Sequence, residues 1–316
     1  MRLIDAAEVR ANLTYEVAIP AVRAAMIALS TGETRQLLRS IMHFEDGRMF
    51  GVMPGAMGEA AAFGAKVLSV FPKNFEVGLP SHQGAVLLFD PVTGELACIA
   101  DARAITAVRT AAASAVATDA LARPDARRLA LLGYGEQAET HARAIAAVRA
   151  LELITVWGRS PERAQTFVAR MQGEVGLEVR VAATAEDAVA DADIVCTLTP
   201  AAQPILKGAW LPAGAHVNLV GSSFAGPREV DDDLVARSRF IADYREGVLA
   251  QGAEFLHAKA AGLVGDDHVV GEIGQVLGKT LVGRQSADQI TVYKSLGHIV
   301  QDLASVQALL AIPPRA

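Results

Sequence analysis

The sequence predicts an α/β protein with two parts: a smaller domain that contains a sheet, followed by a doubly wound parallel sheet. From residue 128 onward, short apolar runs alternate with helical segments, as in a parallel sheet covered by helices on both faces. Before residue 100, Gly, Pro and Asn break the apolar runs, which is typical of a meandering sheet. The 316 residues are enough for two domains of roughly 100–200 residues each.

The first part is predicted to begin with one long helix over residues 5–31, where apolar residues recur at near-helical spacing. The strands expected after it are Met49–Met53, Ala65–Phe71, Ala85–Phe89 and Glu95–Ala100, the last two joined by a turn at Asp90–Gly94. An Ala-rich helix should follow at residues 104–121. Pro124 cannot continue that helix and marks a domain boundary.

The second part is predicted to alternate strands and helices. The strands expected are Arg128–Leu132, Leu153–Trp157, Glu178–Ala182, Ile194–Leu198, His216–Val220 and Phe240–Ala242, and the helices between them are Gln137–Ala150, Pro161–Met171 and Ala185–Val189. A last helix, at residues 286–310, is predicted to return to the first domain. We therefore expect one domain from residues 1–122 with a C-terminal helix at about 296–316, and another from residues 123–295.

Composition and charge exclude several classes of protein. Apolar residues make up 52% of the chain, which supports buried cores. The net charge is −6, from 29 basic and 35 acidic residues without a basic run, so we expect no nucleic-acid partner. No apolar stretch reaches the roughly 18 residues that span a bilayer, and the N-terminus lacks a signal peptide's apolar region. Cys98 and Cys196 should be reduced and buried, so we predict a cytoplasmic protein.

A Gly-rich turn separates the predicted strand at 128–132 from the helix after it and reads Gly133-Tyr134-Gly135-Glu136-Gln137-Ala138. Gly133 permits a tight turn, and Gly135 lets the backbone approach a pyrophosphate at the helix N-terminus. Ala138 replaces the usual third glycine and still permits close packing. With a strand before it, a helix after it and a second strand about 20 residues later, the pattern predicts a Rossmann-type domain that binds a nicotinamide dinucleotide.

The choice of coenzyme depends on the end of the second strand, Trp157-Gly158-Arg159-Ser160. An acidic residue there would accept hydrogen bonds from a ribose 2′-hydroxyl, and none is present. Arg159 and Ser160 could hold a 2′-phosphate, which favours NADPH over NADH. Arg159 could instead stack on adenine in an enzyme that uses NADH, so both coenzymes remain candidates.

Six motifs in this order resemble the ornithine cyclodeaminase/mu-crystallin family: Ala65–Pro72, Leu79–Gly84, Leu88–Gly94, Ile105–Ala112, Gly133–Ala138 and Ile290–Gly297. The match extends from about residue 5 to residue 310. The resemblance implies a homodimer whose subunits have a substrate and dimerisation domain, a Rossmann domain and an active site between them. Family members act on α-amino or α-imino acids: they cyclise ornithine or lysine, oxidise alanine or reduce ketimines.

The resemblance assigns a catalytic role to Lys66 and binding of the substrate carboxylate to Arg39 and Arg109. A guanidinium binds a carboxylate bidentately, which agrees with these roles. A partly desolvated lysine between two arginines would have a depressed pKa, suited to proton transfer near neutrality. The arginines could instead be solvated surface residues, whereas an unpaired lysine in an apolar strand is costly unless it has a function.

The resemblance also assigns contacts with the dinucleotide, to Thr110, Gly133, Tyr134, Gly135, Glu136, Gln137, Arg159, Ser160, Thr199, Ser222 and Lys294. Lys294 could equally cap a helix. The seven histidines form no cluster at metal-ligand spacing, so the sequence gives no support for metal catalysis.

Two positions differ from the cyclodeaminases. Their aspartate after the strand ending at Val220 is Ser223 here, and their glutamate two residues before Met53-Pro54 is Gly51. Both differences resemble the ketimine reductase branch of the family. Because the groups that would bind a second, distal ammonium are missing, we predict a reductase of a small α-imino acid, with Ser223 at the substrate. The candidates are 1-pyrroline-2-carboxylate, 1-piperideine-2-carboxylate, iminosuccinate and the imine of pyruvate.

Three alternatives remain. A cyclodeaminase or amino-acid dehydrogenase would use the same fold in the oxidative direction. A 3-hydroxyproline dehydratase would depend on Ser223 and need no added nicotinamide. A non-catalytic protein would bind dinucleotide and small ligands without turnover, although Lys66, Arg39 and Arg109 argue against it.

Overall fold

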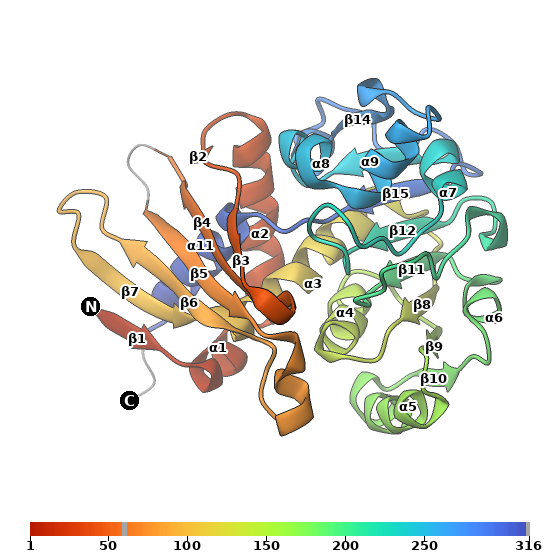
Figure 1. The fold of residues 1–316 in the computed structure, drawn as a ribbon, viewed down its shortest axis with the longest axis horizontal. Helices are drawn as coiled ribbons and strands as arrows, with labels where there is room; N and C mark the ends of the chain where they lie inside the picture. Colours follow the sequence, from red (N-terminus) through yellow and green to blue (C-terminus); the bar gives the residue numbers. More distant parts are fainter. Residues whose placement is uncertain (59–61, 314–316) are drawn as a thin grey trace. The chain divides into compact units, whose positions relative to one another are not determined.

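The computed structural model describes residues 1–58 and 62–313, which divide into two compact units (Figure 1). Unit 1 consists of residues 1–110 and the C-terminal residues from 298 onward, and unit 2 of residues 111–297. The division falls inside the long helix α3 (Ala102–Leu121), whose first turns belong to unit 1. The domain boundary predicted from the sequence, between residues 122 and 123, lies after this helix. The signal used for it was Pro124, which marks the end of the helix and not the division between the two units.

Unit 1 contains a seven-stranded sheet with an antiparallel meander at its centre. The meander consists of β4 (Met49–Ala56), β5 (Phe63–Val70), β6 (His82–Phe89) and β7 (Leu96–Asp101). The other strands are β1 (Arg2–Ile4), parallel to β7, and β2 (Arg35–Gln36) and β3 (Ser40–His43), both antiparallel to β4. The predicted meander is confirmed, as is its turn, where the Asp90 carboxylate accepts hydrogen bonds from the backbone of Val92 and Thr93.

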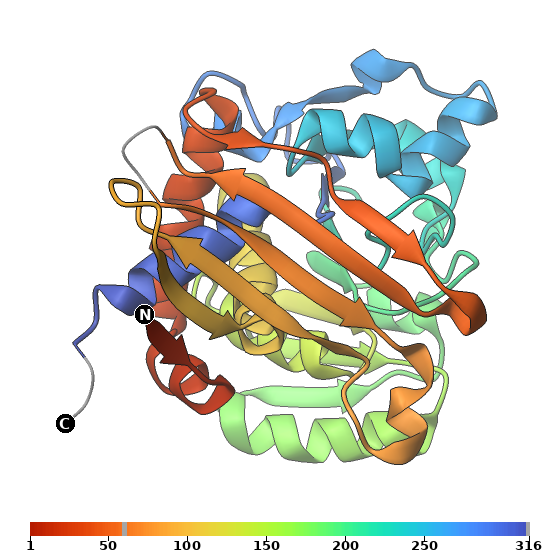
Figure 2. The same cartoon turned by 60° about the vertical axis from the view of Figure 1, so that its left-hand side comes forward.

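Helices α2 (Tyr15–Ser30) and α11 (Ile299–Leu310) pack together, and α11 lies against β4, β5 and β6. Figure 2 shows both helices on one side of the sheet. Glycines permit this close approach: a Cβ on Gly55 would lie 2.6 Å from Ile299, and one on Gly64 would lie 3.2 Å from Leu303. Because side chains alternate along a strand, the face that meets α11 also carries Lys66.

The predicted single helix over residues 5–31 is wrong. The structure has α1 (Ala6–Asn12) and α2, bent by 92° at a break that contains Leu13 and Thr14. Thr14 has extended backbone angles and starts α2 as its N-cap, a position that threonine favours. Apolar spacing does not reveal the break because both helices bury apolar residues. Among the described residues, no single helix is long and apolar enough to cross a membrane; only the bent pair of α1 and α2 meets that test of length and composition.

Unit 2 is built on an eight-stranded sheet in the order β10-β9-β8-β11-β12-β15-β13-β14, with all neighbours parallel. The strands are β8 (Arg128–Leu132), β9 (Leu153–Trp157), β10 (Glu178–Val181), β11 (Ile194–Thr197), β12 (His216–Leu219), β13 (Arg239–Ala242), β14 (Val269–Glu272) and β15 (Thr291–Lys294). The first six places follow the order of a Rossmann fold. The predicted doubly wound sheet is therefore confirmed.

The helices of unit 2 that follow α3 connect these strands. They are α4 (Glu136–Ala146), α5 (Pro161–Val175), α6 (Ala185–Val189), α7 (Asp232–Arg237), α8 (Arg245–Gln251), α9 (Ala253–Ala260) and α10 (Ile273–Leu277). Short 3-10 turns lie at Glu45–Gly47 and Pro72–Val77 in unit 1, and at Gly208–Trp210 and Asp266–His268 in unit 2. Cys98 and Cys196 are free and buried, as predicted.

The predicted last helix, residues 286–310, is wrong in its first half. Residues 291–294 form β15, a fully buried strand between β12 and β13, and the helix begins only at Ile299. A short apolar run with β-branched and aromatic residues fits a buried strand as well as a helix, so periodicity alone could not separate them.

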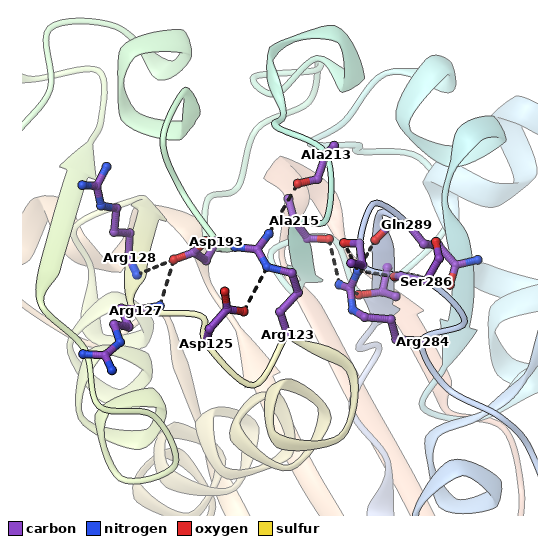
Figure 3. Close-up of polar contacts among 12 residues, drawn as sticks. Arg123, Asp125, Arg127, Arg128, Asp193, Ala213, Ala215, Arg284, Ser286 and Gln289 are labelled. Carbon is purple, nitrogen blue, oxygen red and sulfur yellow. Dashed lines mark hydrogen bonds and ion pairs between the residues drawn. The ribbon is translucent and has the colours of Figure 1, made fainter.

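Two arginines tie together the amino ends of the unit 2 strands (Figure 3). The Arg284 guanidinium donates to the carbonyl oxygens of Leu121 at 2.8 Å and Ala215 at 3.3 Å, and to that of Gln289. Arg123 pairs with Asp193. These arginines line a cavity of about 970 Å³ at the amino ends of the strands, whereas the Gly-rich turn follows the carboxyl end of β8. The hydrogen-bond donors of Arg284 already have partners. We therefore assign this cluster to stability.

The variant Arg284→Met is expected to lower the free energy of unfolding by about 2 kcal/mol, because it leaves several carbonyl oxygens without a donor. The matched control is Arg127→Met, which removes only an ion pair between side chains of Arg127 and Glu152 that are 55% and 59% exposed. It should change stability by about 0.5 kcal/mol or less. Urea unfolding followed by fluorescence measures both, and equal effects would contradict the assignment.

Candidate active site

The Gly-rich turn of unit 2 has the geometry of an anion site. Gly133, after β8, has φ +132°, and a Cβ there would lie 2.8 Å from the Leu198 carbonyl oxygen, so only glycine fits. Gly135 is the N-cap of α4, and the space that its Cβ would occupy is open. Gln137 Oε1, in the first turn of α4, is buried without a partner among the described residues. A dinucleotide pyrophosphate fits this open helix N-terminus, because the free backbone N–H groups there can donate to it.

The end of β9 faces the same turn. A Cβ on Gly158 would lie 2.1 Å from the Tyr134 ring, so glycine is required where the ring lies over the backbone. Ser160 is the N-cap of α5 and accepts a hydrogen bond from Arg163 N at 3.3 Å. The Arg159 side chain is exposed. The strand end thus presents a guanidinium and a hydroxyl.

Three expected cofactor contacts of unit 2 are occupied by the protein itself. The hydroxyls of Thr199 and Ser222 donate to Glu229 at 2.7 Å and to the Pro227 carbonyl oxygen at 2.5 Å. Lys294 is 0% exposed, and its ammonium donates to the Ser222 carbonyl oxygen at 2.6 Å and pairs with Glu254 at 2.7 Å. These bonds satisfy the buried ammonium, since buried charges need partners within the fold, and the expected dinucleotide contact of Lys294 stays a prediction.

In unit 1, α11 brings together the two predicted residues Lys66 and Arg109. Lys66, on β5, is 3% exposed, and its Nζ donates to Asp302 at 3.0 Å and to Thr106 Oγ1 at 3.1 Å. Arg109, on α3, donates to the same Asp302 carboxylate at 3.1 Å and to Gln301 Oε1 at 2.8 Å. One buried carboxylate therefore holds both cations in place.

The electrostatics of this cluster favour an anionic ligand. Burial, the charge of Arg109 and, more weakly, the charge of Arg39 lower the pKa of Lys66 to about 8, although Asp302 opposes the shift. Arg39 therefore lies near enough to act on Lys66, as its predicted role requires. Burial and Arg39 also lower the pKa of His298, at the start of α11, to about 3, so His298 is neutral. The cluster therefore combines three cationic side chains, those of Lys66, Arg109 and Arg39, with the one carboxylate of Asp302.

The two positions that distinguish the branches of the family lie in different units. Gly51, on β4, pairs with Leu68, next to the pair of Met53 with Lys66, so it lies on the same face of the sheet as Lys66. A carboxylate at Gly51 would therefore extend from the same face of the sheet as Lys66. Ser223 is half-buried and follows β12 in unit 2.

Asp302 and Gln301 are the residues that sequence analysis missed. They lie more than 190 positions from Arg109 and Lys66 in the chain. An acidic residue within an otherwise apolar helix was the available signal, because a carboxylate is rarely buried without a partner. Thr110, which was predicted to contact the cofactor, carries a buried hydroxyl without a hydrogen-bond partner among the described residues.

The parallel sheet and Gly-rich turn place this chain in the Rossmann class of dinucleotide-binding folds. A family model described as the ornithine cyclodeaminase/mu-crystallin family matches residues 2–310. The chain therefore belongs to that family, as its motifs predicted.

Several similar proteins are named as reductases. The chain is 35% identical over 311 residues to ketimine reductase mu-crystallin of Mus musculus, covering 96% of this chain and 95% of that protein. It is similar to the solved structure of Thermococcus litoralis Δ1-pyrroline-2-carboxylate reductase in complex with NADH and L-proline, with TM-score 0.95, 31% identity and coverage of 98% and 97%. The iminosuccinate reductase of Paracoccus denitrificans in complex with NAD⁺ gives TM-score 0.91, 30% identity and coverage of 98% and 95%. The predicted reductase branch agrees with these names.

Proposed function

We propose that this protein is an NAD(P)H-dependent reductase that converts a small α-imino acid to the α-amino acid. The observation that carries the proposal is the buried cluster of Lys66, Arg109 and Asp302, in a chain that has Gly51 and Ser223 where the cyclodeaminases have carboxylates. The cluster offers groups that can bind one carboxylate and one nitrogen atom of a substrate. The reductase names of the relatives support the same reaction.

Arg109 and Arg39 bind the substrate carboxylate in this proposal. Bonds to Asp302 and Gln301 engage Nε and Nη1 of Arg109, which fixes the plane of the guanidinium. Nη2 has no partner among the described residues and is available to a ligand oxygen. A guanidinium held in one orientation discriminates acids from amides and esters, because only a carboxylate accepts from it as a charged partner.

Lys66 supplies the proton. With a pKa of about 8, its ammonium is mostly protonated at neutral pH yet acidic enough to donate to an imine nitrogen. The bound coenzyme supplies the hydride to the imine carbon, so the C=N double bond becomes a C–N single bond with one new hydrogen on each atom. Lys66 is left neutral and recovers its proton from solvent.

The assay is oxidation of NADH and of NADPH, followed by absorbance, with 1-pyrroline-2-carboxylate, 1-piperideine-2-carboxylate, oxaloacetate plus ammonia, and pyruvate plus ammonia. Turnover with at least one imine is the expected result. Release of ammonia from ornithine at a comparable rate would overturn the proposal in favour of a cyclodeaminase. Loss of water from 3-hydroxyproline without added nicotinamide would instead identify a dehydratase.

We propose NADPH as the preferred coenzyme, since the end of β9 offers Arg159 and Ser160 and no acidic residue. Replacing Arg159 by alanine is expected to raise the KM for NADPH by about tenfold, because one charge-assisted contact with the 2′-phosphate is lost, and to leave the KM for NADH within about twofold. Arg163→Ala, a nearby arginine on α5, is the control. An equal increase for both coenzymes would indicate stacking on adenine instead.

We also propose a homodimer formed through the face of the unit 1 sheet opposite α11. Phe50 on β4 and Phe63 on β5 alternate with the residues that face α11, and they are 38% and 39% exposed. The ring of Phe63 stacks on that of Phe89, with centroids 5.4 Å apart. Apolar rings gathered on an exposed sheet face favour burial against a second copy. The molar mass from light scattering tests this proposal.

A further inference from the structure

Glu229 is a buried carboxylate at the carboxyl ends of β11 and β12, and it is 0% exposed. Its Oε2 accepts hydrogen bonds from Thr197 Oγ1 at 2.6 Å and Gly221 N at 2.8 Å. Its Oε1 accepts from Thr199 N and Thr199 Oγ1, both at 2.7 Å. Glu229 therefore joins the segment that follows β11 to the segment that follows β12.

These four donors favour the ionised form of Glu229. The two backbone N–H groups, one at each oxygen, can only donate, and such bonds favour the carboxylate over the acid. Burial raises the pKa of Glu229 above its ordinary value, and the bonds from Thr197 and Thr199 and the charge of Lys294 offset part of that rise. The approach of Gly221 requires glycine, because a Cβ there would lie 2.5 Å from Glu229 Oε2.

A second acidic side chain and one basic side chain lie beside Glu229. Lys294 pairs with Glu254 at 2.7 Å, and Glu254 Oε1 accepts from Glu229 N at 3.3 Å. All three side chains are 0% exposed. When both carboxyl groups are ionised, two carboxylates face one ammonium, and these three side chains together carry one net negative charge. In a buried site such a charge is weakly screened, so it acts on a ligand bound at the carboxyl ends of these strands.

The position of this group relates it to one half of the dinucleotide. In a Rossmann fold the dinucleotide lies across the carboxyl ends of the strands, with each half of the sheet holding one mononucleotide. The Gly-rich turn and Arg159 follow β8 and β9, which assigns the adenosine half to that side. The nicotinamide half then lies over β11, β12 and β15, the strands whose ends carry Glu229 and Lys294.

Resting on the reductase function proposed above, we propose that Glu229 positions the nicotinamide-facing segments and that the net negative charge it shares with Glu254 and Lys294 favours the cationic, oxidised coenzyme. When hydride leaves the reduced coenzyme, the nicotinamide ring gains a positive charge. A fixed negative charge nearby stabilises that charge as it develops. The group therefore biases hydride transfer out of the coenzyme, which is the direction of imine reduction.

The test compares direct binding of NAD⁺ and NADH, and of NADP⁺ and NADPH, by calorimetry, without any imine. In Glu229→Gln, which keeps the shape of the side chain, affinity for the oxidised form is expected to fall about tenfold more than affinity for the reduced form. This is the scale of one unit charge acting across several ångströms of protein. A purely structural role would weaken both forms equally, and that result, or an unchanged ratio, would overturn the inference.

Two further variants keep the test decisive. Glu254→Gln removes the same unit of charge and leaves the four bonds of Glu229 in place. It should therefore shift the ratio of the two affinities in the same direction. If Glu229→Gln does not fold, the result for Glu254→Gln decides whether the charge favours the oxidised coenzyme. Glu186→Gln, on the exposed surface of α6, is the matched control and should leave the ratio unchanged. Because the readout is binding, a shifted ratio without imine turnover would retain this inference and reject the proposed reaction.

Discussion

Replacing Lys66 by methionine is expected to lower kcat for imine reduction by about 10²–10⁴-fold, the usual contribution of a positioned proton donor. Methionine has a similar length and keeps the buried strand position filled, but it cannot donate to the imine nitrogen. Stopped-flow oxidation of the reduced coenzyme with saturating imine measures the effect. The coenzyme itself should still bind, because the Gly-rich turn lies in unit 2.

The matched control for Lys66 is Lys259→Met, on α9. Lys259 is an exposed lysine that pairs with Asp266, and its loss should leave kcat unchanged. If Lys66→Met kept kcat within about threefold of the unmodified protein, which is far below the usual effect of removing a proton donor, another donor would have to be sought.

Replacing Asp302 by asparagine is expected to shift the pH profile of kcat/KM. In the unmodified protein the rate should fall as pH rises through about 8, because Lys66 loses the proton that it must donate. Asp302 raises the pKa of Lys66, so removing its charge lowers that pKa and moves the alkaline limb toward lower pH. Each unit by which the pKa falls below the assay pH lowers the rate by about tenfold.

Gln301→Met is the control that separates charge from positioning. Gln301 holds Arg109 through one hydrogen bond at 2.8 Å and carries no charge. Its loss should raise the KM of the imino acid by several-fold and leave the alkaline limb in place. An unchanged limb in Asp302→Asn would show that Asp302 only orients Arg109 and does not set the protonation of Lys66.

The elements that the sequence predicted best are those with local signals. Strands β8 and β9 and helix α6 begin and end at the predicted residues, because each is a short apolar or capped segment between clear turn signals. The helix break at Leu13 and the strand β15 were missed for opposite reasons. At the break, apolar spacing continues through a sharp bend; at β15, a buried strand and a buried helix have the same apolar composition.

In the candidate site too, the sequence predicted what local motifs indicate and missed what depends on distant residues. Lys66 and Arg109 were recognised from motifs around them, and the structure brings both to Asp302. Lys294 was also recognised, but its buried pairing with Glu254 could not be predicted, since 40 positions separate Lys294 from that carboxylate. A motif indicates that a residue has a role, whereas its partner depends on which strands and helices pack together.

Gly51 and Ser223 indicated the reductive branch through their resemblance to the family, whereas the sequence by itself determined the Rossmann-type sheet and the Gly-rich turn at Gly133 and Gly135. These are properties of consecutive residues, because backbone geometry and strand alternation act over a few positions. Only the tertiary structure decided that Asp302 holds Lys66 and Arg109, and that Glu229 ties β11 to β12. Such contacts join residues distant in the chain, and burial makes them strong by removing the water that would otherwise screen the charges.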